Sequence, residues 1–206
     1  MPTLLRIDVS PRGDYSVSKK LADAATAAWL EKNPTGTVTT RDLSKGGPLP
    51  FVDLPWIMGA YSAPDQQTPE IKAAIAVSNE LVDELFAADE ILIATPMYNF
   101  NLPAALKAYV DHIVRAGRTF NAKYEGLITG KKVFVLVASA GSYEPGSHAE
   151  GMNYFTPYMK FILGFVGLSD STIHFASGTS AVMQGQTTFD DYIAQHKPAV
   201  LEAFLK

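Results

Sequence analysis

The sequence alternates short apolar segments with longer segments of helical periodicity, and this alternation constrains the fold more than any other feature. The two most apolar segments are "EILIATP" (90–96) and "KVFVLVAS" (132–139). Such continuous apolar runs are typical of strands buried on both faces of a parallel sheet. Parallel neighbours need a crossover connection, and the chain between these segments is long enough to hold a helix. The pattern therefore predicts an α/β fold.

Three further strands are predicted over residues 3–9, 37–43 and 171–176, where β-branched and apolar residues gather. A helical pattern follows each predicted strand, with apolar residues spaced three and four apart. These helices are expected to begin near Ser16 or Ser18 and near Thr68, and to cover 106–114, 152–166 and 188–205. The order predicts a doubly wound, five-stranded parallel sheet with helices on both faces. Because no repeat or linker interrupts it, we expect residues 1–206 to form one domain.

The composition limits the function classes. The chain has 206 residues, of which 47% are apolar and 18% charged, and its net charge of −4 argues against a nucleic-acid partner. It contains no cysteine, which excludes thiolate nucleophiles, disulfides and cysteine-ligated metals, and which suits a reducing cytoplasm. No segment approaches the length of apolar residues that spans a membrane. We therefore expect a cytoplasmic protein without a membrane or metal requirement.

Residues 44–66 form the longest irregular segment and are rich in glycine and proline. Segments of this length in a compact domain are usually functional or disordered. This one also holds the large apolar residues Phe51, Trp56, Ile57, Met58 and Tyr61. We therefore predict a packed loop that contains short helical pieces.

Three loops follow the predicted carboxyl ends of strands, where doubly wound sheets bind their ligands. The first, "SPRGDYSVS" (10–18), lacks the GxGxxG pattern of dinucleotide sites but places three serine hydroxyls at a helix start. Hydroxyls and helix N-terminal amides together can hold a phosphate monoester. In the alternative interpretation, Ser16 and Ser18 only cap the helix.

The second loop, "PMYNFN" (96–101), holds aromatic and amide side chains in place of the simple turn that a strand–helix junction needs. Asn99 offers both a donor and an acceptor, and Tyr98 and Phe100 could wall a planar ring. Pro103 suits the first turn of the following helix. The alternative is that Asn101 caps this helix while its apolar neighbours pack into the core.

The third loop, "ASAGSYEPGSHAEG" (138–151), is small, polar and glycine-rich after a buried strand. Residues 139–142 would let the backbone approach a ligand closely. His148 could protonate a product or orient a substrate. The alternative is an ordinary surface loop.

With these three motifs the sequence resembles the family of FMN-dependent NADH-azoreductases and quinone reductases, which has a flavodoxin-like fold. Supporting matches are "RAGRTF" (115–120), "EGLITGKK" (125–132) and "TPYMKFILGFVGL" (156–168). The resemblance implies that the first loop holds the FMN phosphate, the second lines the isoalloxazine ring and the third meets the pyrimidine end. The implied cofactor-binding residues are Ser10, Ser16, Val17, Ser18, Pro96, Met97, Tyr98, Asn99, Phe100, Ser139, Ala140, Gly141 and Ser142.

The resemblance also implies an activity. NADH or NADPH would reduce the flavin and leave, and a quinone or azo compound would then take the electrons, in a ping-pong cycle at the interfaces of a homodimer. Because the flavin carries the chemistry, we expect no catalytic side chain. The candidate substrate-pocket residues are Trp56, Tyr61, Phe120, Tyr124 and Phe161. Family members often carry Arg and Gly where this chain has Ala140 and Ser142, which removes a positive charge near the site.

Two other functions remain open. A flavodoxin-like electron carrier would have no substrate pocket of its own and would need an acidic docking surface, which a net charge of −4 favours only weakly. A phosphoester hydrolase or nucleotide-binding protein would use the serine loop together with a nucleophile or carboxylates at strand ends. Asp8 is not expected at the end of its strand, which counts against this second alternative.

Overall fold

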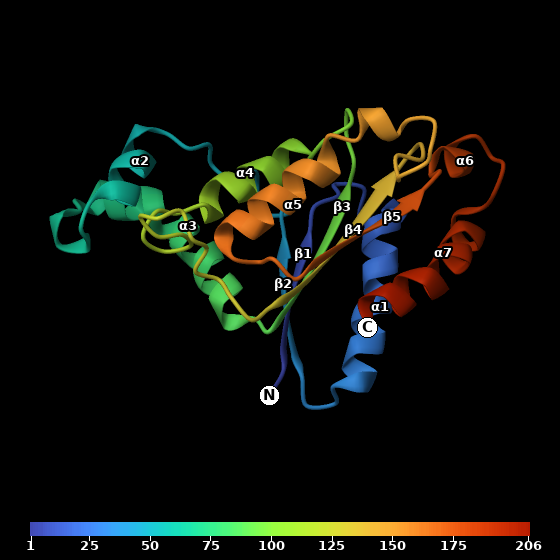
Figure 1. Ribbon diagram of the computed structural model, residues 1–206, viewed down its shortest axis with the longest axis horizontal. Coiled ribbons are helices and arrows are strands. Elements are labelled where there is room, and N and C mark those ends of the chain that lie inside the picture. The colour runs from blue at the N-terminus through green and yellow to red at the C-terminus, as the bar shows by residue number, and fades with distance from the viewer.

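The computed structural model describes residues 1–206, with the side chain of Pro64 excepted. Its centre is a five-stranded sheet with the order β2-β1-β3-β4-β5, in which all neighbours are parallel (Figure 1). The strands are β1 (Thr3–Asp8), β2 (Thr37–Asp42), β3 (Glu90–Pro96), β4 (Lys132–Ser139) and β5 (Ser171–Ser177). The order reverses between β1 and β3, which is where doubly wound sheets open a crevice. The predicted fold class and the five predicted strands are confirmed.

Helices cover both faces of the sheet (Figure 1). On one face lie α3 (Pro69–Ala87), α4 (Ala104–Ile113) and α5 (Phe155–Val166), and on the other lie α1 (Val17–Lys32) and α7 (Phe189–Phe204). Alternate strand residues point to opposite faces, so Leu5 and Ile7 join the first core while Leu4 joins the second. Central strands are therefore apolar throughout because both of their faces are buried.

Side-chain caps explain where several helices begin. Ser16 accepts a hydrogen bond from the amide of Lys19 at the start of α1, and Thr68 and Thr188 cap α3 and α7 in the same way. The predicted starts of these helices are confirmed. Two other boundaries differ by a few residues. Pro103 lies just before α4 and not inside its first turn, and α5 begins after a short 3-10 turn at Glu150–Met152.

The irregular segment contains α2 (Leu54–Tyr61) and a 3-10 turn at Pro64–Gln66, as predicted. The side chain of Trp56 is buried, and its indole Nε1 donates a hydrogen bond to Nδ1 of the buried His112 at 3.1 Å. The predicted packing is wrong for other large residues of the segment, because Phe51 and Tyr61 are 82% and 76% exposed. A helix of two turns can turn only one stripe inward, so Tyr61 and other apolar side chains of α2 face solvent, while Phe51 lies in the irregular chain before the helix.

The end of β1 also differs from expectation. β1 ends at Asp8, one residue earlier than predicted, so Asp8 does lie at a strand end. Its buried carboxylate accepts a hydrogen bond from Nε of Arg6 at 2.9 Å, which pairs the two charges within the fold.

None of the described helices is both long and apolar enough to cross a lipid bilayer.

Candidate cofactor-binding site

The three predicted loops meet at the carboxyl ends of β1, β3 and β4, where they line a cavity of about 190 Å³. Eight predicted cofactor-binding residues contribute to its lining: Ser10, Ser16, Val17, Ser18, Pro96, Met97, Tyr98 and Ala140. The rest of the lining is made of Arg12, Ala138, Thr179 and Met183. Segments about 160 residues apart in the sequence therefore form one site at the reversal of strand order.

One end of this cavity is polar and is built by the first loop. Ser10, Ser16 and Ser18 are buried, and the hydroxyl oxygens of Ser16 and Ser18 lie 3.3 Å apart. Ser16 also caps α1, so its capping role and a ligand-binding role are compatible. The first amides of α1 have no partner within the helix, and together with the hydroxyls they suit an anion. We call the first-loop residues 10–18 the phosphate pole.

Arg12 is the charged residue of the cavity lining and was not among the predicted residues. Its backbone N–H donates to the hydroxyl of Ser10 at 3.3 Å, which folds the loop back over the cavity. A cation between two serines at a predicted helix start was the available signal. Its charge would favour a dianionic phosphate beside the helix N-terminus.

The other end of the cavity is less polar and is built by the second and third loops. Met97 N–H donates to the carbonyl oxygen of Ala138 at 2.9 Å, which joins the two loops behind the cavity. Tyr98 and Asn101 exchange backbone hydrogen bonds of 3.1 and 3.0 Å, which closes a tight turn. We call residues 96–100 and 138–142 the ring pole.

Asn99 and Phe100 occupy the tip of this turn with φ angles of 47° and 68°. Asparagine tolerates this left-handed region, whereas an aromatic residue rarely adopts it, and such strain is often found at functional sites. Both side chains are exposed and lie outside the cavity lining in this chain. Phe100 contacts Tyr143 edge to face, with ring centroids 6.0 Å apart.

A short helix after β5 completes the ring pole. This helix is α6 (Ser180–Met183), and two hydrogen bonds join it to the third loop. Thr179 N–H, just before the helix, donates to the carbonyl oxygen of Ser139 at 3.0 Å, and Ser180 Oγ donates to the carbonyl oxygen of Ala140 at 2.9 Å. Thr179 and Met183 thereby reach the cavity. These two residues were not among the predicted ones, because no motif marks the segment beyond β5. Of the predicted third-loop residues, Ser139, Gly141 and Ser142 lie outside the lining.

The predicted substrate-pocket residues lie apart from this cavity. Trp56 is buried against His112, and the guanidinium carbon of Arg115 lies 5.5 Å from the centroid of the Trp56 ring. Tyr61 is exposed. The remaining three gather around Phe165, whose ring centroid lies 4.8 Å from Phe120, 6.3 Å from Tyr124 and 6.1 Å from Phe161. Within one chain, these side chains form an aromatic cluster on the α5 side of the sheet.

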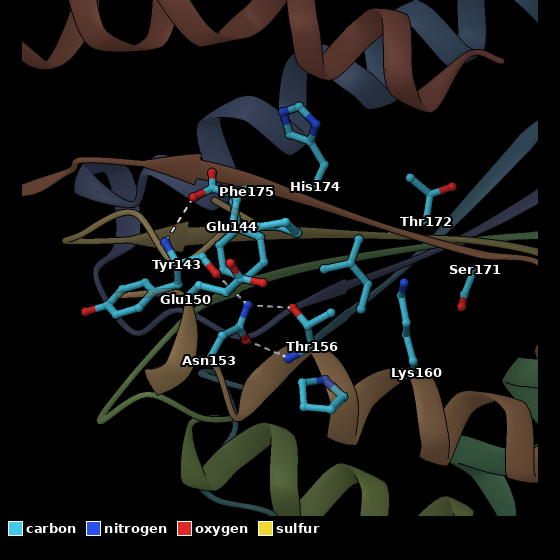
Figure 2. A pocket seen from close by; sticks show the side chains of 13 residues that line it. Tyr143, Glu144, Glu150, Asn153, Thr156, Lys160, Ser171, Thr172, His174 and Phe175 are labelled. Carbon is cyan, nitrogen blue, oxygen red and sulfur yellow. Dashed lines mark hydrogen bonds between the residues drawn. The ribbon is translucent and has the colours of Figure 1, made fainter. Parts of the chain in front are cut away.

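A larger groove of about 700 Å³ runs between β5 and α5 (Figure 2). Several of its polar groups bond to one another: Asn153 Nδ2 donates to Thr156 Oγ1 at 3.0 Å, and Tyr143 N–H donates to Glu144 at 3.0 Å. His148 is exposed and lies outside the groove lining. The groups that line the two cavities distinguish them better than their volumes do. The smaller one combines buried hydroxyls, helix N-terminal amides and a less polar wall that includes Met97, Tyr98 and Met183, so it is the candidate site.

The carboxylates near these strand ends are paired with cations and with hydroxyls. Lys19 Nζ contacts Asp42 at 2.9 Å, and although burial opposes its ionisation, hydrogen bonds from Ser44 and Lys19 lower the pKa of Asp42. Within the described residues, no group of three or more His, Cys, Asp or Glu side chains is arranged to hold a metal ion. The hydrolase interpretation therefore gains no support from Asp8, although that residue ends its strand.

Comparison with known proteins identifies the family. A family model described as a flavodoxin-like fold matches residues 2–200, and the chain belongs to this family. A curated protein from Trichormus variabilis, named FMN-dependent NADH:quinone oxidoreductase 2, is 44% identical over 207 residues, which are 98% of each chain. A relative of the same name from Jannaschia sp. is 44% identical over 94% of this chain and 95% of its own.

Solved structures agree. An azoreductase from Bacillus anthracis is 27% identical with a TM-score of 0.84, and 99% of each chain is covered. An FMN-dependent NADH-azoreductase from Bacillus anthracis, solved in complex with FMN, is 25% identical with a TM-score of 0.83 over 99% of this chain and 98% of its own. The resemblance seen in the sequence is thus confirmed.

Proposed function

We propose that this protein is an FMN-dependent oxidoreductase that passes electrons from NADH to quinones, with azo compounds as a second class of acceptor. One observation carries the proposal: a single cavity at the strand-order reversal joins the buried hydroxyls of the first loop to a less polar ring pole that includes Met97, Tyr98 and Met183. The relatives' names supply the donor, the cofactor and the acceptor class. NADPH is the alternative donor, because no residue of this chain has been assigned to the nicotinamide ribose.

The residues of the cavity fit FMN. Buried hydroxyls of Ser10, Ser16 and Ser18 and the first amides of α1 would hold its phosphate, and Arg12 would offset the charge. Because the phosphate is held there, the ring would extend toward Met97, Tyr98 and Ala140. When bound, FMN would accept electrons from the nicotinamide and deliver them to the acceptor. The protein's own residues bind and orient it.

The volume of the cavity supports a cycle in which the electron donor and the acceptor bind one after the other at the same exposed face of the flavin. Its volume of about 190 Å³ lies below the roughly 300 Å³ that is typical of small-ligand pockets, so it would enclose only part of FMN. The exposed part of the ring would then admit one planar partner at a time. We therefore propose a ping-pong cycle in which the nicotinamide leaves before the quinone or azo compound binds.

The exposed aromatic surface supports a homodimer. Side chains beside the ring pole are partly or largely exposed, including Tyr98 at 42%, Phe100 at 43% and Tyr154 at 61%. Contiguous apolar surface of this kind is typical of an interface. We propose that a second copy covers it, closes the open side of the cavity and brings the exposed face of α2 or the cluster around Phe165 to the substrate. We also propose a cytoplasmic location.

The test begins with the colour of the purified protein. FMN should co-purify or bind on titration, NADH should bleach it without oxygen, and a quinone should restore it. Initial rates at several quinone concentrations should give parallel double-reciprocal lines, and intersecting lines would contradict the ping-pong order. A protein that takes up no FMN would overturn the proposal. FMN binding without reduction by either nicotinamide would favour the electron-carrier function.

A further inference from the structure

The carboxylate of Glu144, a residue that lines the larger groove, ties the loop after β4 to the end of β5. One of its oxygens, Oε2, accepts hydrogen bonds from Ser142 Oγ at 2.7 Å and from the backbone N–H of Tyr143 at 3.0 Å. The other oxygen, Oε1, accepts from Ser177 Oγ at 2.7 Å. Figure 2 shows the carboxylate of Glu144 turned back toward the Tyr143 amide of its own loop. The side chain therefore holds the loop after β4 against the end of β5.

A polar contact leads from Ser177 toward the wall of the cavity. Ser177 Oγ lies 3.3 Å from Ser139 Oγ, and Ser139 Oγ donates to the carbonyl oxygen of Gly141 at 2.7 Å. Ser139 stands between Ala138 and Ala140, which both line the cavity. Glu144 therefore reaches the ring pole directly through Ser142 and approaches the side chain of Ser139 by way of Ser177.

The carboxylate also brings a negative charge that its hydrogen-bond partners do not cancel. Burial opposes its ionisation, but hydrogen bonds from Ser142 and Ser177 lower the pKa of Glu144. These donors, like Tyr143 N–H, are neutral, so they fix the charge in place without offsetting it. Among the lining residues of the ring pole, Ala138, Ala140, Met97 and Tyr98 carry no positive charge.

We propose that Glu144 is a positioning residue that holds residues 139–142 in place and that its charge lowers the reduction potential of FMN bound beside them. This inference rests on the proposed function, because it requires the flavin ring to lie at the ring pole. Reduction adds negative charge to the bound cofactor, and a fixed carboxylate nearby opposes that change. Bound FMN should therefore be a stronger electron donor to the acceptor than it would be without Glu144.

The experiment compares Glu144→Gln with the control Glu150→Gln. Glutamine keeps the shape and an acceptor oxygen but removes the charge, and Glu150 is an exposed carboxylate of the same segment that accepts a hydrogen bond from Gly146 N–H at 2.7 Å. The Kd values of oxidised and of reduced FMN are measured without oxygen. In Glu144→Gln, the ratio of the Kd of oxidised FMN to the Kd of reduced FMN should rise on the order of fivefold, which corresponds to a more positive reduction potential. In Glu150→Gln the ratio should stay within about twofold of wild type.

A second variant separates position from charge. Ser177→Ala keeps the carboxylate and removes one of its hydrogen bonds, so both forms of FMN should bind more weakly while their ratio stays unchanged. An unchanged ratio in Glu144→Gln overturns the electrostatic role, as does a folded Glu144→Gln that binds neither form. Wild-type affinity in both variants overturns the positioning role. If the wild-type protein itself binds no FMN, the proposed function has failed instead.

Discussion

The phosphate pole and the ring pole are built in different ways. All four residues predicted at the phosphate pole line the cavity, and they lie within nine consecutive positions around one helix start. At the ring pole only Pro96, Met97, Tyr98 and Ala140 of the nine predicted residues line it, and the wall is completed by Thr179 and Met183 from beyond β5. The first pole is a local structure, whereas the second is assembled from three separate segments.

The difference gives each pole its own experimental signature. Riboflavin has the flavin ring but no phosphate. Changes at the phosphate pole should therefore weaken FMN binding and leave riboflavin binding unchanged, while changes at the ring pole should weaken both.

The largest effect is expected from removing two hydroxyls of the phosphate pole. Ser16→Ala combined with Ser18→Ala should weaken FMN binding by about 10- to 100-fold, because each hydrogen bond to a charged group contributes roughly 1.5–3 kcal/mol and water replaces part of it. Fluorescence titration with FMN and with riboflavin measures the difference. Thr188→Ala removes a comparable cap from α7, at a residue outside the cavity lining, and should lower stability without changing FMN affinity. Equal losses for FMN and riboflavin would contradict the assignment of this pole.

The next effect concerns the charge of Arg12. Arg12→Gln should weaken FMN binding by about threefold to tenfold and leave riboflavin binding unchanged, since an exposed cation contributes roughly 1 kcal/mol to an anion beside it. Added salt should shrink the difference between wild type and variant. Lys20→Gln, which removes an exposed charge from α1 outside the cavity lining, is the matched control. Identical FMN affinities of Arg12→Gln and Lys20→Gln would remove Arg12 from the site.

A smaller effect is expected at the tip of the second loop. Asn99 has a φ of 47°, and leucine there would cost about 1 kcal/mol, so Asn99→Leu should distort the turn and weaken FMN and riboflavin alike by roughly threefold. Asn101→Leu, two positions further along and outside the left-handed region, serves as the comparison. Unchanged affinity and unchanged turnover in Asn99→Leu would show that this corner does not contact the flavin.

The smallest effect concerns the ion pair beneath the phosphate pole. The pKa of Asp42 is below its ordinary value of 3.8, so its contribution is present above that pH and is lost as the pH falls through the lowered pKa. Asp42→Asn should cost less than about 1 kcal/mol at pH 7, with FMN affinity within about twofold of wild type. Urea unfolding at pH 7 and near pH 3 measures the loss in free energy of unfolding, with Glu31→Gln on the exposed face of α1 as control. If Asp42→Asn loses the same amount of stability at both pH values, the ion pair is excluded as the cause of that loss.

Much of the fold could be predicted because its signals are local. The strands 90–96 and 132–139 follow from continuous apolar runs, and the starts of α1 and α3 follow from a serine and a threonine that cap them. The strand order needed the further rule that parallel crossovers are right-handed and short. The phosphate pole was predictable for the same reason, because its hydroxyls and the helix amides are neighbours in the chain.

The sequence by itself thus determined the α/β class, the main elements, the family and the first-loop residues that line the cavity. Only the tertiary structure decided that Trp56 packs on His112, that α6 walls the cavity and that Glu144 joins the ends of β4 and β5. The physical reason is that apolar periodicity and capping depend on residues a few positions apart. The partner of a side chain such as Trp56 or Glu144 depends on which distant segment the crossovers bring beside it.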